Sequence, residues 1–158
     1  MKKLIVLMFF CVSCNDITTY KTQISFKNNL SNTITVQLFP KKEFSSFDMY
    51  RLNENGSYRL NKFQILSGED YDIISKPKKG QTPIELINER FDSLEIYTNT
   101  KVLKFKAQKV ENYKSNLFED LSSWNYKKNE REFPTQFKRN TVIFDDYYFN
   151  VDSLKIEN

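Results

Sequence analysis

Residues 93–107 have the sequence SLEIYTNTKVLKFKA, in which hydrophobic side chains recur at every second position on both sides of a polar turn. In the first half, Leu94 and Ile96 would share one face of a β-strand. In the second half, Leu103, Phe105 and Ala107 would point inward, while Lys104 and Lys106 would lie on the solvated face of the strand. The segment therefore predicts an antiparallel β-hairpin with one buried face.

The same alternation recurs along the chain and predicts about seven to nine short strands. The clearest further segments are residues 22–27, 33–39, 62–66, 70–75, 84–87 and 137–144. The first two flank a turn-forming stretch at residues 28–32, which predicts a second hairpin. Short antiparallel strands separated by turns are typical of an immunoglobulin-like β-sandwich. We therefore expect an all-β single domain over residues 22–158, with one or two short helices.

Residues 108–136 lose this alternation. Within them, three hydrophobic residues at helical spacing predict a short helix over residues 116–121, capped by Ser115. Residues 124–134 have no regular pattern and are predicted to form a long loop. A second short helix is expected after Asp145.

The first 13 residues have the layout of a bacterial signal peptide. Lys2 and Lys3 supply positive charge, residues 4–12 form a hydrophobic run, and the small Ser13 precedes the expected cut. A transmembrane helix needs about 20 hydrophobic residues, so this run is too short to span a membrane. We expect export of the chain and removal of residues 1–13.

The expected cut lies directly before Cys14, and residues 11–14 (Cys-Val-Ser-Cys) resemble the lipobox of bacterial lipoproteins. In such proteins the thiol of this cysteine receives a diacylglycerol group. Cys14 is the single cysteine of the mature chain, and a lone thiol is a liability in an oxidising compartment. We expect lipidation of Cys14 and a short tether over residues 14–21; secretion without a lipid is the alternative.

Several segments resemble small lipoproteins of Bacteroidetes, especially those of flavobacteria. They are the lipobox, residues 24–36, residues 91–96 with the lysine-rich strand that follows, and the aromatic and acidic residues 143–147. The resemblance implies a lipid-anchored, β-rich domain of the cell envelope. It implies no catalytic residue, because proteins of this kind are mostly uncharacterised.

Charge and composition exclude several classes of function. Without Lys2 and Lys3, the mature chain has 24 − 2 = 22 basic and 20 acidic residues, a net charge of +2. A nucleic-acid binder usually shows a clustered basic face instead. The sequence has no histidine, which removes the commonest general base and metal ligand. We expect no enzymatic activity, cofactor, metal site or nucleic-acid partner.

The acidic residues offer two alternatives to this expectation. Asp145 and Asp146 are adjacent, so in a strand they would point to opposite faces and would not flank one substrate bond. Asp70 and Asp72 would share one strand face and suit Ca²⁺, but no calcium-loop spacing accompanies them. A carboxylate-based glycan hydrolase would need carboxylates brought together from distant segments.

Aromatic residues of the predicted loop are the candidate contact surface. Exposed Trp124, Tyr126 and Phe133 would stack on a sugar or anchor a protein partner. Packing of these rings in the core is the other interpretation, and it is favoured because Trp and Phe in a β domain usually lie there. A basic stretch at residues 76–80 would either touch anionic lipid headgroups or form a solvated loop.

These features together predict a monomeric, lipid-anchored binding or structural module of the cell envelope, located at the outer membrane. Its partner would be another envelope protein or a glycan, in addition to the membrane itself. The alternatives are the glycan hydrolase and an immunity or inhibitor lipoprotein that shields its own cell from a toxin.

Overall fold

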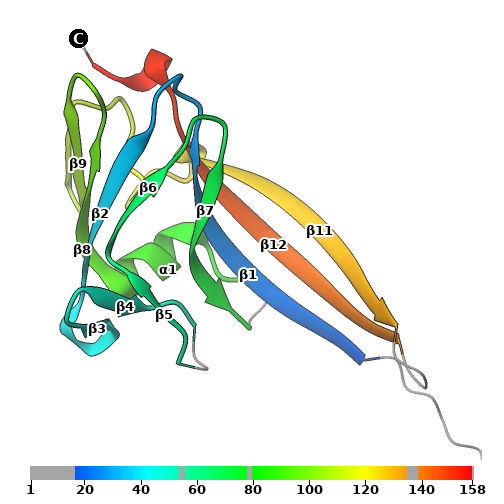
Figure 1. Cartoon of the computed structure of the whole chain (residues 1–158). Helices are drawn as coiled ribbons and strands as arrows, with labels where there is room; N and C mark the ends of the chain where they lie inside the picture. Colours follow the sequence, from blue (N-terminus) through cyan, green and yellow to red (C-terminus); the bar gives the residue numbers. More distant parts are fainter. Residues whose placement is uncertain (1–16, 54–55, 78–79, 135–138, 158) are drawn as a thin grey trace, which may run out of the picture.

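The computed structural model describes residues 17–53, 56–77, 80–134 and 139–157 (Figure 1). The predicted signal peptide and Cys14 lie outside this part of the chain. The larger sheet has the strand order β10 (Lys109–Glu111), β9 (Val102–Lys106), β8 (Phe91–Tyr97), β2 (Ile34–Pro40) and β6 (Lys62–Ile65). The second sheet has the order β11 (Trp124–Pro134), β12 (Arg139–Val151), β1 (Ile17–Asn28) and β7 (Asp70–Lys76).

A small third sheet and a few helical turns complete the described chain. The small sheet has the order β3 (Ser45–Ser46), β4 (Met49–Arg51) and β5 (Tyr58–Leu60). The helical elements are α1 (Pro83–Arg90) and the 3-10 turns η1 (Lys42–Phe44), η2 (Leu121–Ser123) and η3 (Ser153–Lys155). None of the helices in the described ranges is long and apolar enough to cross a membrane. The prediction of an all-β sandwich with short helices is confirmed.

The hydrophobic core lies between the two large sheets, and Phe149 of β12 is near its centre. The Phe149 ring centroid lies 5.9 Å from that of Phe26, 5.6 Å from Phe105, 5.6 Å from Tyr113 and 5.7 Å from Trp124. All five side chains are buried. Aromatic pairs of this kind contribute about 0.5–1.5 kcal/mol each beyond the burial of their area. One β12 residue therefore joins rings from both sheets and from the segments between them.

The hairpin predicted at residues 93–107 is confirmed. It consists of β8 and β9, which pair antiparallel from Ser93 opposite Lys106 to Tyr97 opposite Val102. The strands predicted at residues 62–66 and 70–75 are also present, as β6 and β7. The β8–β9 hairpin and β6 bury the face that their alternating hydrophobic residues define, whereas β7 buries the neighbouring Ile73 and Ile74 at a bulge in its pairing with β1.

The second predicted hairpin is wrong, because β1 and β2 belong to different sheets. The side chain of Asn28 is fully buried at the crossing point and donates to the backbone oxygens of Asn32 (2.8 Å) and Ile65 (3.0 Å). These bonds hold the chain as it passes from one sheet to the other. Sequence alternation cannot reveal the crossing, since strands that pair and strands that face each other across a core both bury one face.

The central pair of the four-stranded sheet is parallel. β1 and β12 lie in register from Ile17 opposite Asn140 to Asn28 opposite Val151, and the other pairs among the described strands are antiparallel. β12 is longer than the strand predicted at residues 137–144, and the helix expected beyond it is the single turn η3. The pairing places the first and last strands of the described chain side by side.

Residues 84–87, predicted as a strand, belong to α1 instead. The Thr82 hydroxyl accepts a hydrogen bond from the backbone N–H of Glu85 (3.2 Å), and the Glu85 carboxylate accepts one from the backbone N–H of Thr82 (2.9 Å). This capping box, followed directly by Pro83, stabilises the start of a helix. The prediction failed because a short hydrophobic run fits either period, and the cap was the deciding signal.

Two further predictions after β10 are wrong. Residues 116–121 contain a turn, in which the Asn116 side chain accepts from the N–H of Phe118 (3.1 Å), and Ser115 caps no helix. Residues 124–134 form β11 rather than a loop. Beyond Trp124 most residues of this strand are exposed on both faces, so no hydrophobic alternation marks it.

The ends of three strands extend past the sandwich as a ribbon that we call the stalk (residues 17–21, 128–134 and 139–144; Figure 1). The central Phe144 ring lies 5.9 Å from the Lys21 Nζ atom and 5.1 Å from the Arg131 guanidinium carbon. Of the tether predicted over residues 14–21, residues 17–21 form the start of β1 and pair with β12.

Candidate functional site

Trp124 is a core residue. Its side chain is 7% exposed, and the indole N–H donates to the backbone oxygen of Leu117 at 3.0 Å. The favoured interpretation, packing in the core, is confirmed for Trp124, and its place in an exposed contact loop is wrong. Of its two predicted companions, Phe133 lies in β11 but its side chain is outside the described part of the structure.

Tyr126 is the exposed member of the predicted contact surface. It is 55% exposed, and its ring centroid lies 5.2 Å from that of Tyr147. The hydroxyl donates to Asp145 Oδ1 at 2.8 Å, and this bond raises the pKa of Tyr126 to about 12. Tyr126 is therefore a fixed, neutral hydrogen-bonding group at an edge of the four-stranded sheet.

Asp145 and Asp146 point to opposite faces of β12, as the sequence predicts. Asp145 accepts from Tyr126 on one face, and Asp146 accepts from the Asn129 amide on the other. Asp146 is 6% exposed, and its Oδ1 atom has no hydrogen-bond partner among the described residues. Burial raises the pKa of Asp146, although the bond from Asn129 opposes this effect. A buried acceptor without a donor costs about 1–3 kcal/mol.

The described part of the structure adds no further ligand residue to Asp70 and Asp72, the pair predicted as the alternative calcium site. Asp72 Oδ1 accepts from the Ser25 hydroxyl at 2.7 Å. Within the ranges that the structure describes, no group of three or more histidine, cysteine, aspartate or glutamate residues is placed to hold a metal ion.

A groove crosses the outward face of the four-stranded sheet, and we call it the outer-face groove. Its volume is about 380 Å³, and it is lined by Lys27, Asp70, Asn125, Tyr126, Lys127, Tyr148 and Asn150. The strand register explains the grouping, because Asn125 lies opposite Tyr148, and Lys27 lies opposite both Asn150 and Asp70. The lining therefore comes from all four strands, β11, β12, β1 and β7.

The outer-face groove combines amides, a carboxylate, ammonium groups and a phenol. Burial and then the nearby Asp146 carboxylate raise the pKa of Tyr148, so its hydroxyl stays protonated at neutral pH. Asn150 Oδ1 is buried and has no donor among the described residues. The site thus offers many hydrogen-bonding groups with little net charge.

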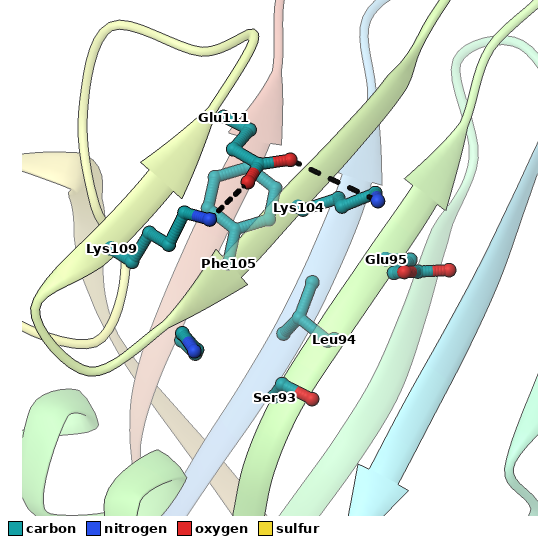
Figure 2. A pocket seen from close by; sticks show the side chains of 8 residues that line it. Ser93, Leu94, Glu95, Lys104, Phe105, Lys109 and Glu111 are labelled. Carbon is teal, nitrogen blue, oxygen red and sulfur yellow. Dashed lines mark ion pairs between the residues drawn. The ribbon is translucent and has the colours of Figure 1, made fainter.

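A second groove of about 230 Å³ lies on the outward face of the five-stranded sheet (Figure 2). Glu111 lies between two lysines, with its carboxylate oxygens 2.5 Å from Lys109 Nζ and 3.8 Å from Lys104 Nζ. Lys109 holds the pKa of Glu111 below its ordinary value. The two lysines thus have a carboxylate beside them, which fits the prediction that Lys104 lies on a solvated strand face.

The basic stretch at residues 76–80 is only partly described, since Lys78 and Lys79 lie outside the described ranges. Lys76 Nζ forms an ion pair with Glu89 of α1 at 2.9 Å. Lys76 therefore connects β7 to the helix.

Comparison of the chain with family models, with curated proteins and with solved structures gave no significant match. The site must therefore be interpreted from its own residues. Sequence reasoning named Tyr126 and Asp70 among the lining residues, although the Tyr126 side chain lies on the opposite face of β11 with Asp145. It missed the others, because they come from strands whose pairing is not encoded locally. The short helix expected after Asp145 also hid Tyr148 and Asn150, which lie in β12.

Proposed function

We propose that this protein is a lipid-anchored lipoprotein of the bacterial outer membrane that acts as a non-catalytic binding module. The lipobox at residues 11–14 and the charged, hydrophobic start of the chain support the anchor. The observation that carries the proposal is the position of Ile17, the first residue of β1, at the free end of the stalk.

The spacing between Cys14 and Ile17 sets the geometry of the anchor. Three residues reach at most about 11 Å when extended. A lipid on Cys14 would hold the end of the stalk at the membrane surface. The five residue steps from Ile17 to Thr22 would then place the sandwich about 17 Å farther out, at the usual rise of a strand.

The outer-face groove supports binding rather than hydrolysis. Most glycoside hydrolases use two carboxylates that flank the scissile bond. Asp70 is the carboxylate among the residues that line this groove, while Asp145 and Asp146 face opposite sides of β12. A single carboxylate can bind a ligand hydroxyl but does not supply the acid and base pair.

Metabolic labelling with a clickable palmitate tests the anchor. Wild-type chain and Cys11→Ser should carry the label and sediment with membranes, whereas Cys14→Ser should carry none. The Cys11 variant is the matched control, because it removes the other cysteine of the sequence. An unlabelled wild-type chain in the soluble fraction would show that the protein is secreted without a lipid.

A further inference from the structure

We propose that the outer-face groove binds a carbohydrate chain of neutral sugars. This inference rests on the proposed role as a binding module and names the ligand class of its site. It follows from the course of the groove, the chemistry of its lining and its charge, which are independent of one another.

The groove runs from one edge of the sheet to the other. Asn125 belongs to β11 and Asp70 to β7, and these strands are the two edges in the order β11-β12-β1-β7. Between them the lining comes from the central strands β12 and β1. A site that reaches both sheet edges suits a ligand that continues past it, such as a polymer chain, better than an enclosed small molecule.

The lining side chains match the surface of a sugar. Sugar hydroxyls both donate and accept hydrogen bonds, and the amides of Asn125 and Asn150 do the same. Lys27 and Asp70 lie opposite each other on neighbouring strands, so a donor and an acceptor are available to adjacent hydroxyls. The half-buried Tyr148 adds an aromatic ring, whose face packs well against C–H groups.

An unpaired acceptor in the groove indicates where a ligand hydroxyl would donate. Asn150 lines the groove, and its Oδ1 atom is buried without a donor among the described residues. A ligand hydroxyl that reached this atom would satisfy it, which a purely apolar partner would not do.

The charge of the groove limits the kinds of sugar that it can bind. Lys27 and Lys127 contribute +2, and Asp70 with the nearby carboxylates of Asp72 and Asp146 opposes them. The charges therefore nearly balance, which favours a neutral sugar. The second groove offers no comparable ring, because its one aromatic residue, Phe105, is 1% exposed in the core.

Titration calorimetry with purified oligosaccharides tests the proposal. The full-length gene is expressed in a bacterium that processes lipoproteins, and the protein is purified from the fraction that contains it. The probes are short chains of glucose, mannose, xylose, galactose and N-acetylglucosamine, which are all neutral. At least one should bind the wild type, and Tyr148→Ala should weaken that binding by about tenfold or more.

Matched variants separate the groove from the fold. Asn125→Ala changes an exposed residue of the edge strand and should weaken binding by about fivefold without unfolding the protein. Tyr148→Phe keeps the ring and should retain most of the affinity. Lys106→Ala alters the second groove and should bind like the wild type.

Two results would overturn the proposal: no binding of any probe, or binding that Asn125→Ala and Tyr148→Ala leave unchanged. The fraction from which the protein is purified reports separately on the anchor. A soluble, unlabelled chain that still binds sugar through this groove would refute the lipid anchor and leave the ligand class standing.

Discussion

Asp146 is a buried carboxylate with one unpaired oxygen, and this makes stability depend on pH. Burial raises its pKa, so the folded state keeps the proton to a higher pH than the unfolded chain. As pH rises from about 3.9 through the raised pKa of Asp146, the folded protein therefore loses stability. We predict that Asp146→Asn is more stable than the wild type at neutral pH and equal to it below about pH 3.5. Urea unfolding at both pH values measures this, and a pH-independent difference would contradict it.

Trp124 contributes to folding rather than to contact with a partner. Its ring packs on Phe149 and its N–H is paired with Leu117, so Trp124→Ala should reduce the free energy of unfolding by about 3–5 kcal/mol. Tyr126→Ala is the matched control at an exposed site and should cost about 1 kcal/mol or less. Chemical denaturation followed by circular dichroism compares them. A Trp124→Ala variant as stable as the wild type would place this side chain outside the core.

The start of α1 is the element whose stability depends most clearly on a local signal. Thr82→Ala removes the acceptor for the Glu85 N–H and should destabilise the protein by about 1 kcal/mol. Thr82→Ser keeps a hydroxyl at the same position and should cost little. Urea denaturation distinguishes the two variants. Equal losses for serine and alanine would show that the cap does not stabilise the helix.

The stalk is the element expected to open most readily. There β1 pairs on one side only, because its pairing with β7 begins at Thr22. Little side-chain burial supports residues 17–19, whereas Ile24 and Phe26 are fully buried. Amide hydrogen exchange should therefore be faster at residues 17–21 than at residues 24–26. Equal protection along β1 would indicate that the stalk is as stable as the sandwich.

Local pattern predicts those elements whose partners are close in sequence. The β8–β9 hairpin follows from alternation around a short turn, and β6 and β7 follow in the same way. β11 has no buried face beyond Trp124 and therefore no pattern, and the parallel pairing of β1 with β12 joins distant segments. The outer-face groove depends on that pairing, so sequence reasoning named Asp70 and Tyr126 but could not show that the residues of four strands come together there.

At the scale of the whole molecule, the stalk gives the proposed anchor a direction. β12 runs from Arg139 in the stalk to Val151 at the opposite end of the sandwich. At that far end a hollow is lined by residues of the Asn29–Asn32 connection, the β8–β9 turn and the C-terminal segment, including Asn99. In a protein anchored at Cys14, the stalk would lie nearest the membrane, and this end would face away from it.

Fluorescence quenching in liposomes tests this orientation most directly. A fluorophore is attached to the lipidated protein at Thr19→Cys in the stalk or at Asn99→Cys in the far turn, both exposed sites. Lipids with a nitroxide on the headgroup quench only fluorophores close to the membrane surface. The account predicts strong quenching at residue 19 and little at residue 99. Equal quenching at both sites, or stronger quenching at residue 99, would contradict it.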